Sequence, residues 1–93
     1  MGAAVRFEND LTRMLGVRYP IIQGAFGHVG TSSLAAPVSE AGGLGIITSI
    51  CYPTPEDFRQ DLQRAREMTD NPFAVNFTLW KGKIENEYHE GYI

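Results

Sequence analysis

The sequence contains little cysteine and no long apolar run, and these two absences exclude several classes of protein. The single cysteine, Cys51, excludes an internal disulfide and a zinc site built on several thiolates. No apolar segment is long enough to span a bilayer, and the N-terminus lacks the hydrophobic stretch of a signal peptide. We therefore expect a soluble, cytoplasmic protein with no metal site and no membrane partner.

Basic residues are also scarce. The net charge is −3, and no basic stripe occurs along the chain. This balance argues against a nucleic-acid partner. With 93 residues, the chain makes at most one small domain.

Helix and strand signals alternate along most of the chain. A short helix carries Leu11, Met14 and Leu15, with Asn9 or Asp10 as its N-terminal cap and Gly16 just past its end. Strands are expected at 19–24, 44–48 and 73–79, with helices at 32–41 and from Pro55 to just before Asn71-Pro72. Residues 80–93 give no clear pattern. The first strand has a mainly apolar character, which predicts burial on both of its faces.

The two longer expected helices differ in the strength of their signals. Leu34, Val38 and Ala41 form the expected buried stripe of the first, and Pro37 predicts that this helix starts late or bends. Thr54-Pro55 gives the second a cap and a first-turn proline. Its buried stripe is Phe58, Leu62, Ala65 and Met68. Asp61 is expected on its solvent face, beside Arg64.

The order of elements predicts an α/β fold, a short helix followed by a βαβαβ unit with parallel strands. A complete (β/α)₈ barrel typically needs about 250 residues. The chain therefore looks like the front end of a larger protein, with residues 1–93 forming an incomplete segment of one domain. Three strands would leave open sheet edges, so we expect a homo-oligomer or association with the remainder of the barrel.

A glycine-rich turn, Gly24-x-x-Gly27-x-x-Gly30, follows the first strand and precedes a helix. Ligands bind at this end of parallel strands because backbone N–H groups and the helix N-terminus converge there. The spacing is not the dinucleotide fingerprint G-x-G-x-x-G, and no acidic residue follows about 20 residues later. The turn therefore favours a ligand other than NAD, although it could simply be a tight connection.

Three polar residues lie near the ends of the later strands. Thr48 and Ser49 end the second strand on one face of the sheet, where their hydroxyls could reach a cofactor or cap a loop. Asn76 interrupts an otherwise apolar strand, and a buried amide requires partners. Those partners could be neighbouring backbone groups or a ligand. His28, in the glycine turn, is expected to be a loop residue without a catalytic partner.

Three segments, 19–24, 34–47 and 69–76, together resemble the N-terminal third of the nitronate monooxygenase family. The most specific is Ala41-Gly42-Gly43-Leu44-Gly45-Ile46-Ile47, which directly follows the expected helix. The family includes flavin-type enoyl-acyl-carrier-protein reductases. This sequence departs from the usual family pattern at Phe26, His28 and Pro37.

The resemblance implies a TIM barrel that binds FMN at its C-terminal face. It implies that Gly24, Ala25 and Phe26 lie against the flavin ring, that Asn76 contacts FMN, and that Thr48 and Ser49 open on the same pocket. The family's catalytic His lies downstream of residue 93. The implied activity is FMN-dependent oxidation of nitronates or nitroalkanes with oxygen, so the resemblance implies a small-molecule substrate.

Three alternatives remain. The first is a flavin-dependent enoyl-acyl-carrier-protein reductase, and the second is a non-catalytic fragment that only assembles with itself or with the rest of its barrel. The third, a flavin-free phosphate-binding barrel, would require a Lys or an acid at a strand end, and the sequence has none there.

Overall fold

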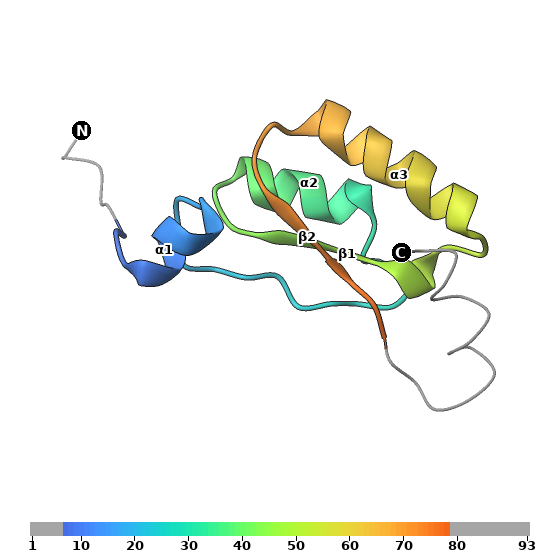
Figure 1. Cartoon of the computed structure of the whole chain (residues 1–93), viewed down its shortest axis with the longest axis horizontal. Helices are drawn as coiled ribbons and strands as arrows, with labels where there is room; N and C mark the ends of the chain where they lie inside the picture. Colours follow the sequence, from blue (N-terminus) through green and yellow to red (C-terminus); the bar gives the residue numbers. More distant parts are fainter. Residues whose placement is uncertain (1–6, 79–93) are drawn as a thin grey trace.

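A computed structural model describes residues 7–78, and Figure 1 shows their arrangement. In chain order the elements are α1 (Asp10–Leu15), α2 (Ser32–Glu40), β1 (Gly45–Thr48), the 3₁₀ helix η1 (Ser49–Cys51), α3 (Pro55–Met68) and β2 (Phe73–Asn76). The expectations for Leu79 and for residues 80–93 lie outside the described residues. No helix within residues 7–78 is long and apolar enough to cross a membrane.

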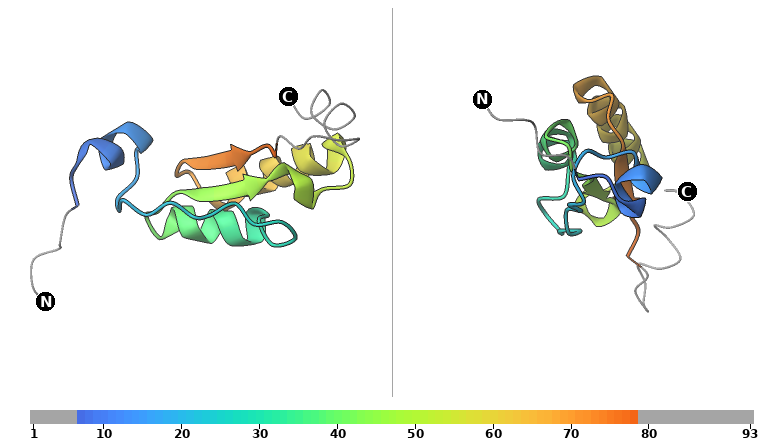
Figure 2. Two further views of the ribbon diagram at one scale, coloured as in Figure 1. Left: turned by 90° about the horizontal axis from the view of Figure 1, so that it is seen from below. Right: turned by 90° about the vertical axis from the view of Figure 1, so that its left-hand side faces the viewer.

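The centre of the fold is a βαβ unit. β1 and β2 pair in parallel, with Gly45 beside Phe73 at one end and Thr48 beside Asn76 at the other, and α3 connects them. α2 and α3 lie next to each other on one side of the two strands (Figures 1 and 2). The expected α/β class with a parallel sheet is therefore confirmed, whereas the complete barrel stays a prediction.

The ends of α1 and α3 follow their sequence signals. The Asn9 side chain accepts a hydrogen bond from the Thr12 N–H at 2.9 Å, and the Thr12 hydroxyl accepts one from the Asn9 N–H at 3.0 Å. Gly16 ends α1 with φ 68°, a left-handed conformation that glycine adopts without strain. In α3, the Thr54 hydroxyl accepts from the Asp57 N–H at 3.1 Å, and Pro55 occupies the first turn.

α2 uses a different face from the expected one. Its buried residues are Ser32, Ala35, Ala36 and Ser39, whereas Ala41 is exposed and only partial burial is reached at Leu34 and Val38. The reason is a close approach to β1, because a Cβ on Gly45 would lie 2.0 Å from the Ala35 carbonyl oxygen. Only small side chains fit between two backbones at such a distance, so Ala35 and Ala36 are buried and the larger Leu34 and Val38 are only partly buried. α2 begins at Ser32, as the expected range has it, and keeps Pro37 inside it, so of the two expectations for Pro37 the late start is wrong and the bend stays a prediction.

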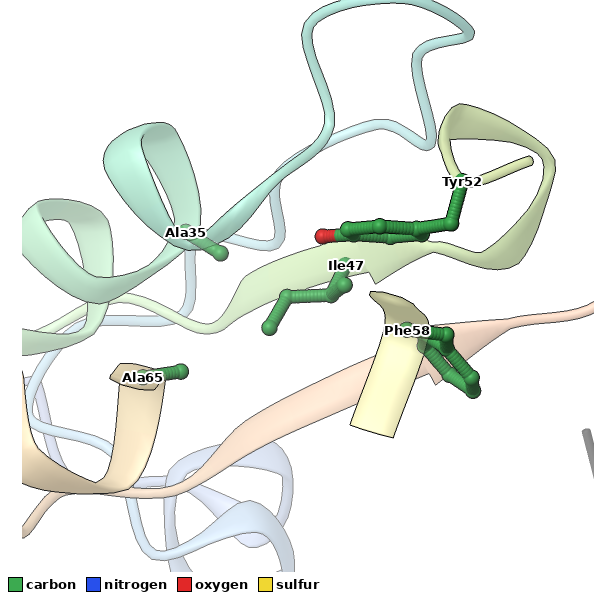
Figure 3. Packing of buried hydrophobic residues seen from close by; sticks show 5 residues of the cluster. All are labelled: Ala35, Ile47, Tyr52, Phe58 and Ala65. Carbon is green, nitrogen blue, oxygen red and sulfur yellow. The ribbon is translucent and has the colours of Figure 1, made fainter. Parts of the chain in front are cut away.

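The main core lies between the sheet and the helices. Figure 3 shows Ile47 of β1 surrounded by Ala35, Tyr52, Phe58 and Ala65. Ile47 and Ala35 are completely buried. Leu62 packs against this cluster, as expected, but Met68 is 44% exposed and does not belong to the buried stripe.

The expected strand at 19–24 is reduced to a single parallel bridge between Ile22 and Leu44. Its burial on both faces was also wrong, because Ile21 is 61% and Ile22 48% exposed. Within residues 7–78, α2 and α3 cover one side of the sheet and no helix or strand covers the other. Ile22, the bridge partner of Leu44, is an apolar residue left exposed on the uncovered side, whereas Leu44 itself is buried.

Candidate functional site

The candidate site lies at the carboxyl ends of β1 and β2. Thr48 and Asn76 are register partners there, so their side chains lie on the same face of the sheet. Ile47 points toward the helices (Figure 3), and successive strand residues alternate between faces. Thr48 and Asn76 therefore belong to the face that the helices leave uncovered. In open parallel sheets, this end of the strands is where ligands bind.

Along the edge of β1 that faces residues 21–30, the backbone polar groups find their hydrogen-bond partners in three different ways. The Leu44 N–H donates to the Ile21 carbonyl at 2.9 Å, as in an ordinary parallel ladder. The Ile46 N–H instead donates to the Gln23 side-chain oxygen at 3.2 Å, and the Gln23 amide donates to the Ile46 carbonyl at 3.0 Å. The Thr48 N–H donates to the Gly30 carbonyl at 2.7 Å. The backbone between Gln23 and Gly30 is thus left out of the ladder.

We call these intervening residues, 24–29, the arch. All of them are exposed, and they leave the sheet and return to it at the carboxyl end of β1. The Gly30 N–H closes the arch by donating to the Phe26 carbonyl at 3.0 Å, and the Cys51 thiol donates to the same oxygen at 3.5 Å. The three residues expected to contact a flavin, Gly24, Ala25 and Phe26, form its first half.

Two positions in and beside the arch have special backbone requirements. At Gly30, an added Cβ would lie 2.5 Å from the Phe26 carbonyl oxygen and 2.7 Å from the Thr48 hydroxyl oxygen, so only glycine fits. His28 has φ 70°, the only positive value among the non-glycine residues of the described chain. A non-glycine residue in this conformation is uncommon and stores some strain.

Thr48 carries an unsatisfied polar atom. The residue is 2% exposed, and its hydroxyl is the one buried side-chain oxygen or nitrogen of residues 7–78 that has no hydrogen-bond partner. A buried hydroxyl in that condition costs about 1–3 kcal/mol. An orphaned hydroxyl beside Gly30 at a strand end fits a site where a polar ligand atom or a water completes the bonding.

Asn76 is partly buried, and the Thr78 hydroxyl donates to its side-chain oxygen at 3.3 Å. Within residues 7–78, this is the hydrogen bond that its side chain makes. The side-chain NH₂ makes no hydrogen bond to another group of residues 7–78. Ser49 differs from the expectation, because β1 ends at Thr48 and Ser49 begins η1, so the two residues do not share a face of the sheet.

The sequence interpretation missed a buried polar cluster next to the arch. Asp61 was expected in solvent, but it is only 7% exposed. Its carboxylate accepts hydrogen bonds from the Ser32 N–H at 2.8 Å, from the Ser32 hydroxyl at 2.6 Å and from the Tyr52 hydroxyl. Asp61 of α3 therefore caps the N-terminus of α2, a task that the side chain of Thr31 does not perform.

The electrostatics of this cluster follow from its contacts. Burial alone would raise the pKa of Asp61, but the hydrogen bonds from Ser32 and Tyr52, together with the Arg64 guanidinium, lower it below its usual value. Burial and the hydrogen bond to Asp61 raise the pKa of Tyr52 far above its usual range. Tyr52 therefore stays protonated and Asp61 ionised at neutral pH. The signal was present in the sequence, since Asp61 follows Phe58 by three residues and precedes Ala65 by four, which places it on their face.

Two surface hollows lie away from the arch. One, of about 290 Å³, lies near Arg18, Glu40 and Asn71 at the opposite end of the strands. The other, of about 280 Å³, lies between α2 and α3 near Asp61 and Arg64. Neither is lined by the arch, Thr48 or Asn76. Within the part of the chain that the structure describes, no group of acidic, His and Cys residues is arranged to hold a metal ion.

Comparison with known proteins identifies the family. The family model for nitronate monooxygenase matches residues 8–92, almost the whole chain. The chain belongs to the nitronate monooxygenase family. This is a family of flavin-dependent oxidoreductases, and the resemblance inferred from the sequence is confirmed.

Individual relatives agree with this assignment. The nitronate monooxygenase of Pseudomonas aeruginosa is 48% identical over 65 residues, which cover 70% of this chain and 18% of the relative. A probable nitronate monooxygenase of Staphylococcus haemolyticus is 40% identical over 70 residues, or 75% of this chain and 19% of the relative. The chain thus spans about a fifth of the length of these curated relatives.

Two solved structures share its fold. FabK from Thermotoga maritima superimposes with a TM-score of 0.78 at 37% identity, over 92% of this chain and 26% of FabK. A nitroalkane oxidase from Streptomyces ansochromogenes gives a TM-score of 0.59 at 40% identity, over 71% of this chain and 18% of the oxidase. With sequence identities of 37% and 40%, these two structures support membership of the family as well as a shared fold.

Proposed function

We propose that the intact protein is an FMN-dependent oxidoreductase that oxidises nitronates or nitroalkanes with oxygen. The observation that carries the proposal is the arch, whose exposed backbone lies at the carboxyl end of β1 beside the register partners Thr48 and Asn76. The family and the names of the relatives from P. aeruginosa and S. ansochromogenes support the substrate class.

In this proposal the residues of the chain bind and orient the flavin. The FMN-binding set is Gly24, Ala25, Phe26, Thr48, Ser49 and Asn76. The backbone of the arch lies against the ring, and the Asn76 side chain donates a hydrogen bond to it. Bound flavin would supply electron transfer between the substrate and oxygen, and the protein would position it and exclude water. The proton-transferring residue is proposed to lie beyond residue 93.

We further propose that residues 1–93 are the N-terminal segment of a single FMN-binding barrel. Within residues 7–78, β2 has one strand neighbour and the sheet has one covered face. Open edges and exposed apolar residues such as Ile21 and Ile22 require further strands or a partner chain to cover them. Residues 1–93 on their own should therefore neither hold FMN tightly nor turn over a substrate.

The FabK likeness favours a second candidate, a flavin-dependent enoyl thioester reductase. The two candidates differ in whether the substrate gives electrons to the flavin or takes electrons from it. A nitronate oxidase consumes oxygen when an alkyl nitronate is added, whereas an enoyl reductase oxidises a reduced nicotinamide only when an enoyl thioester is present.

The experiment that tests the proposal uses the purified intact protein. We expect a yellow preparation that releases FMN on denaturation and consumes oxygen with an alkyl nitronate. Enoyl-dependent nicotinamide oxidation without nitronate-dependent oxygen consumption would favour the second candidate. A colourless preparation that releases no flavin and takes up none would contradict both.

A further inference from the structure

The unusual contact at the candidate site is the one between the Gln23 side chain and the edge of β1. The bridge between Ile22 and Leu44 sets the register of residues 21–23 against this strand. Continued by two residues, a parallel ladder would place the Ile46 N–H on the Gln23 carbonyl and the Ala25 N–H on the Ile46 carbonyl. The side-chain amide of Gln23 makes both bonds instead, as acceptor at 3.2 Å and as donor at 3.0 Å.

The Gln23 side chain thus takes the place of the backbone on Ile46, and this changes the path of the residues after Gln23. Because the Gln23 side chain satisfies both polar groups of Ile46, the backbone N–H of Ala25 has no partner on β1 and the chain leaves the sheet. The next position on the edge, the Thr48 N–H, is taken by the Gly30 carbonyl at 2.7 Å rather than by Ala25. The arch is therefore bounded by Gln23 on one side and by Gly30 on the other.

We propose that Gln23 is a positioning residue that holds the arch out of the sheet and so sets its geometry toward the flavin. The part concerning the flavin rests on the proposed function, whereas the part concerning the arch rests on the hydrogen bonds alone. A side chain without an amide would leave the Ile46 N–H and carbonyl unpaired, or would let residues 23–25 pair with them directly. Either outcome moves Gly24, Ala25 and Phe26, the residues proposed to lie against the ring.

The test compares Gln23→Leu with a matched control, Asn71→Leu, in the intact protein. Asn71 also donates from its side-chain amide to a backbone carbonyl, that of Ser39 at 2.9 Å, but it lies at the other end of the sheet. In flavin-free protein, the Ile46 amide should exchange with solvent about tenfold faster or more in Gln23→Leu, the effect of about one lost hydrogen bond. The Leu44 amide, bonded to the Ile21 carbonyl, should keep its protection. Both amides should keep theirs in Asn71→Leu.

The second measurement is FMN affinity, from the fluorescence of FMN titrated into apoprotein. Gln23→Leu should bind FMN about tenfold more weakly or worse, and Asn71→Leu should stay within about twofold of the native affinity. Gln23→Glu adds a readout that general destabilisation does not produce. Its carboxylate has no donor for the Ile46 carbonyl, but the protonated acid has one. Its affinity relative to the native protein should therefore recover as the pH falls from 7 toward about 4.5.

The outcomes separate the two proposals. Unchanged exchange at Ile46 in Gln23→Leu would overturn the role of Gln23 in holding the arch. Faster exchange with FMN affinity equal to that of Asn71→Leu would overturn its role in positioning the flavin. If the native protein takes up no flavin while Ile46 still responds, the proposed function fails and the assignment of Gln23 to the arch stands.

Discussion

The two faces of the short sheet have different surroundings, although the same two strands form both. On the covered face, Ile47 is completely buried and Gly45 allows the backbone of α2 to approach closely. On the uncovered face, Thr48 and Asn76 lie side by side next to the arch. Successive residues of β1 therefore alternate between the two faces: Gly45 and Ile47 pack against the helices, whereas Thr48 belongs to the candidate site.

Because the two faces of β1 have different surroundings, we expect folding and binding to be separable within this strand. The covered face is filled by apolar and small side chains, and changes there should alter stability first. The uncovered face holds an orphaned hydroxyl on Thr48 and a partly satisfied amide on Asn76, and changes there should alter ligand binding first. Substitutions matched across the two faces test whether stability and ligand binding can be changed separately.

The largest effect is expected at Ile47. Replacing a completely buried Ile by Ala should lower the free energy of unfolding by about 2–5 kcal/mol, because it leaves a cavity among Ala35, Phe58 and Ala65. The matched change Ile46→Ala, at a partly exposed position on the other face, should lower it by less than half as much. Chemical denaturation of the intact proteins measures both, and equal losses would show that the two faces are packed alike.

A second large effect is expected at Gly45. The added methyl group of Gly45→Ala would meet the Ala35 backbone at 2.0 to 2.8 Å, so α2 must move away from the sheet. Overpacking of this kind typically lowers the free energy of unfolding by about 1–3 kcal/mol or more. Gly27→Ala in the arch is the control, because an added Cβ there meets no atom within 4 Å. A Gly45→Ala protein as stable as Gly27→Ala would contradict the close contact between α2 and β1.

The elements that the sequence predicted well are those whose signals are local. Asn9 and Gly16 bound α1, and Thr54-Pro55 starts α3, because caps act on backbone groups within one turn. The face of α2 could not be predicted in this way. It depends on Gly45, which lies outside the helix, and the closeness of two backbones is not visible in the hydrophobic pattern of one helix.

The candidate site shows the same division. Its place at the strand ends follows from the order of elements, and the glycine turn and Asn76 were found from sequence. The end of the first strand at Gln23 was not found, because nothing in the sequence shows that a side-chain amide replaces the backbone on Ile46. Asp61 was placed in solvent because it is charged, although its spacing from Phe58 and Ala65 puts it on the buried face.

The buried carboxylate gives a prediction of pH dependence. The pKa of Asp61 is lower in the folded than in the unfolded protein, so its stabilising contribution is complete above the unfolded value, near pH 4, and is lost as the pH falls through the folded value. Asp61→Asn should therefore be less stable than the native protein at pH 7 and should lose less stability on acidification. Unfolding free energies measured between pH 7 and pH 3 test this.

The control for Asp61 is Asp10→Asn. Asp10 pairs with Arg13 on the surface of α1, and its side chain is 99% exposed. Its replacement should change the unfolding free energy only slightly at any of these pH values. If Asp61→Asn follows the native acid profile as closely as Asp10→Asn does, the carboxylate does not couple α2 to α3 in the way its hydrogen bonds indicate.

The smallest change in stability, and the sharpest test of the uncovered face, is expected for Asn76→Leu. Leucine suits the apolar strand around it, and the hydrogen bond lost within residues 7–78 is the long one from Thr78, at 3.3 Å. Unfolding free energy should therefore change by less than about 1 kcal/mol. FMN affinity should fall by between about twofold and about a hundredfold, because one or two hydrogen bonds to the ligand, each worth about 0.5–1.5 kcal/mol, are lost. Denaturation of the apoprotein and FMN titration measure the two effects separately. Undiminished FMN affinity together with clear destabilisation would show that Asn76 has a packing role. Of the two register partners on the uncovered face, only Thr48 would then remain in the candidate site.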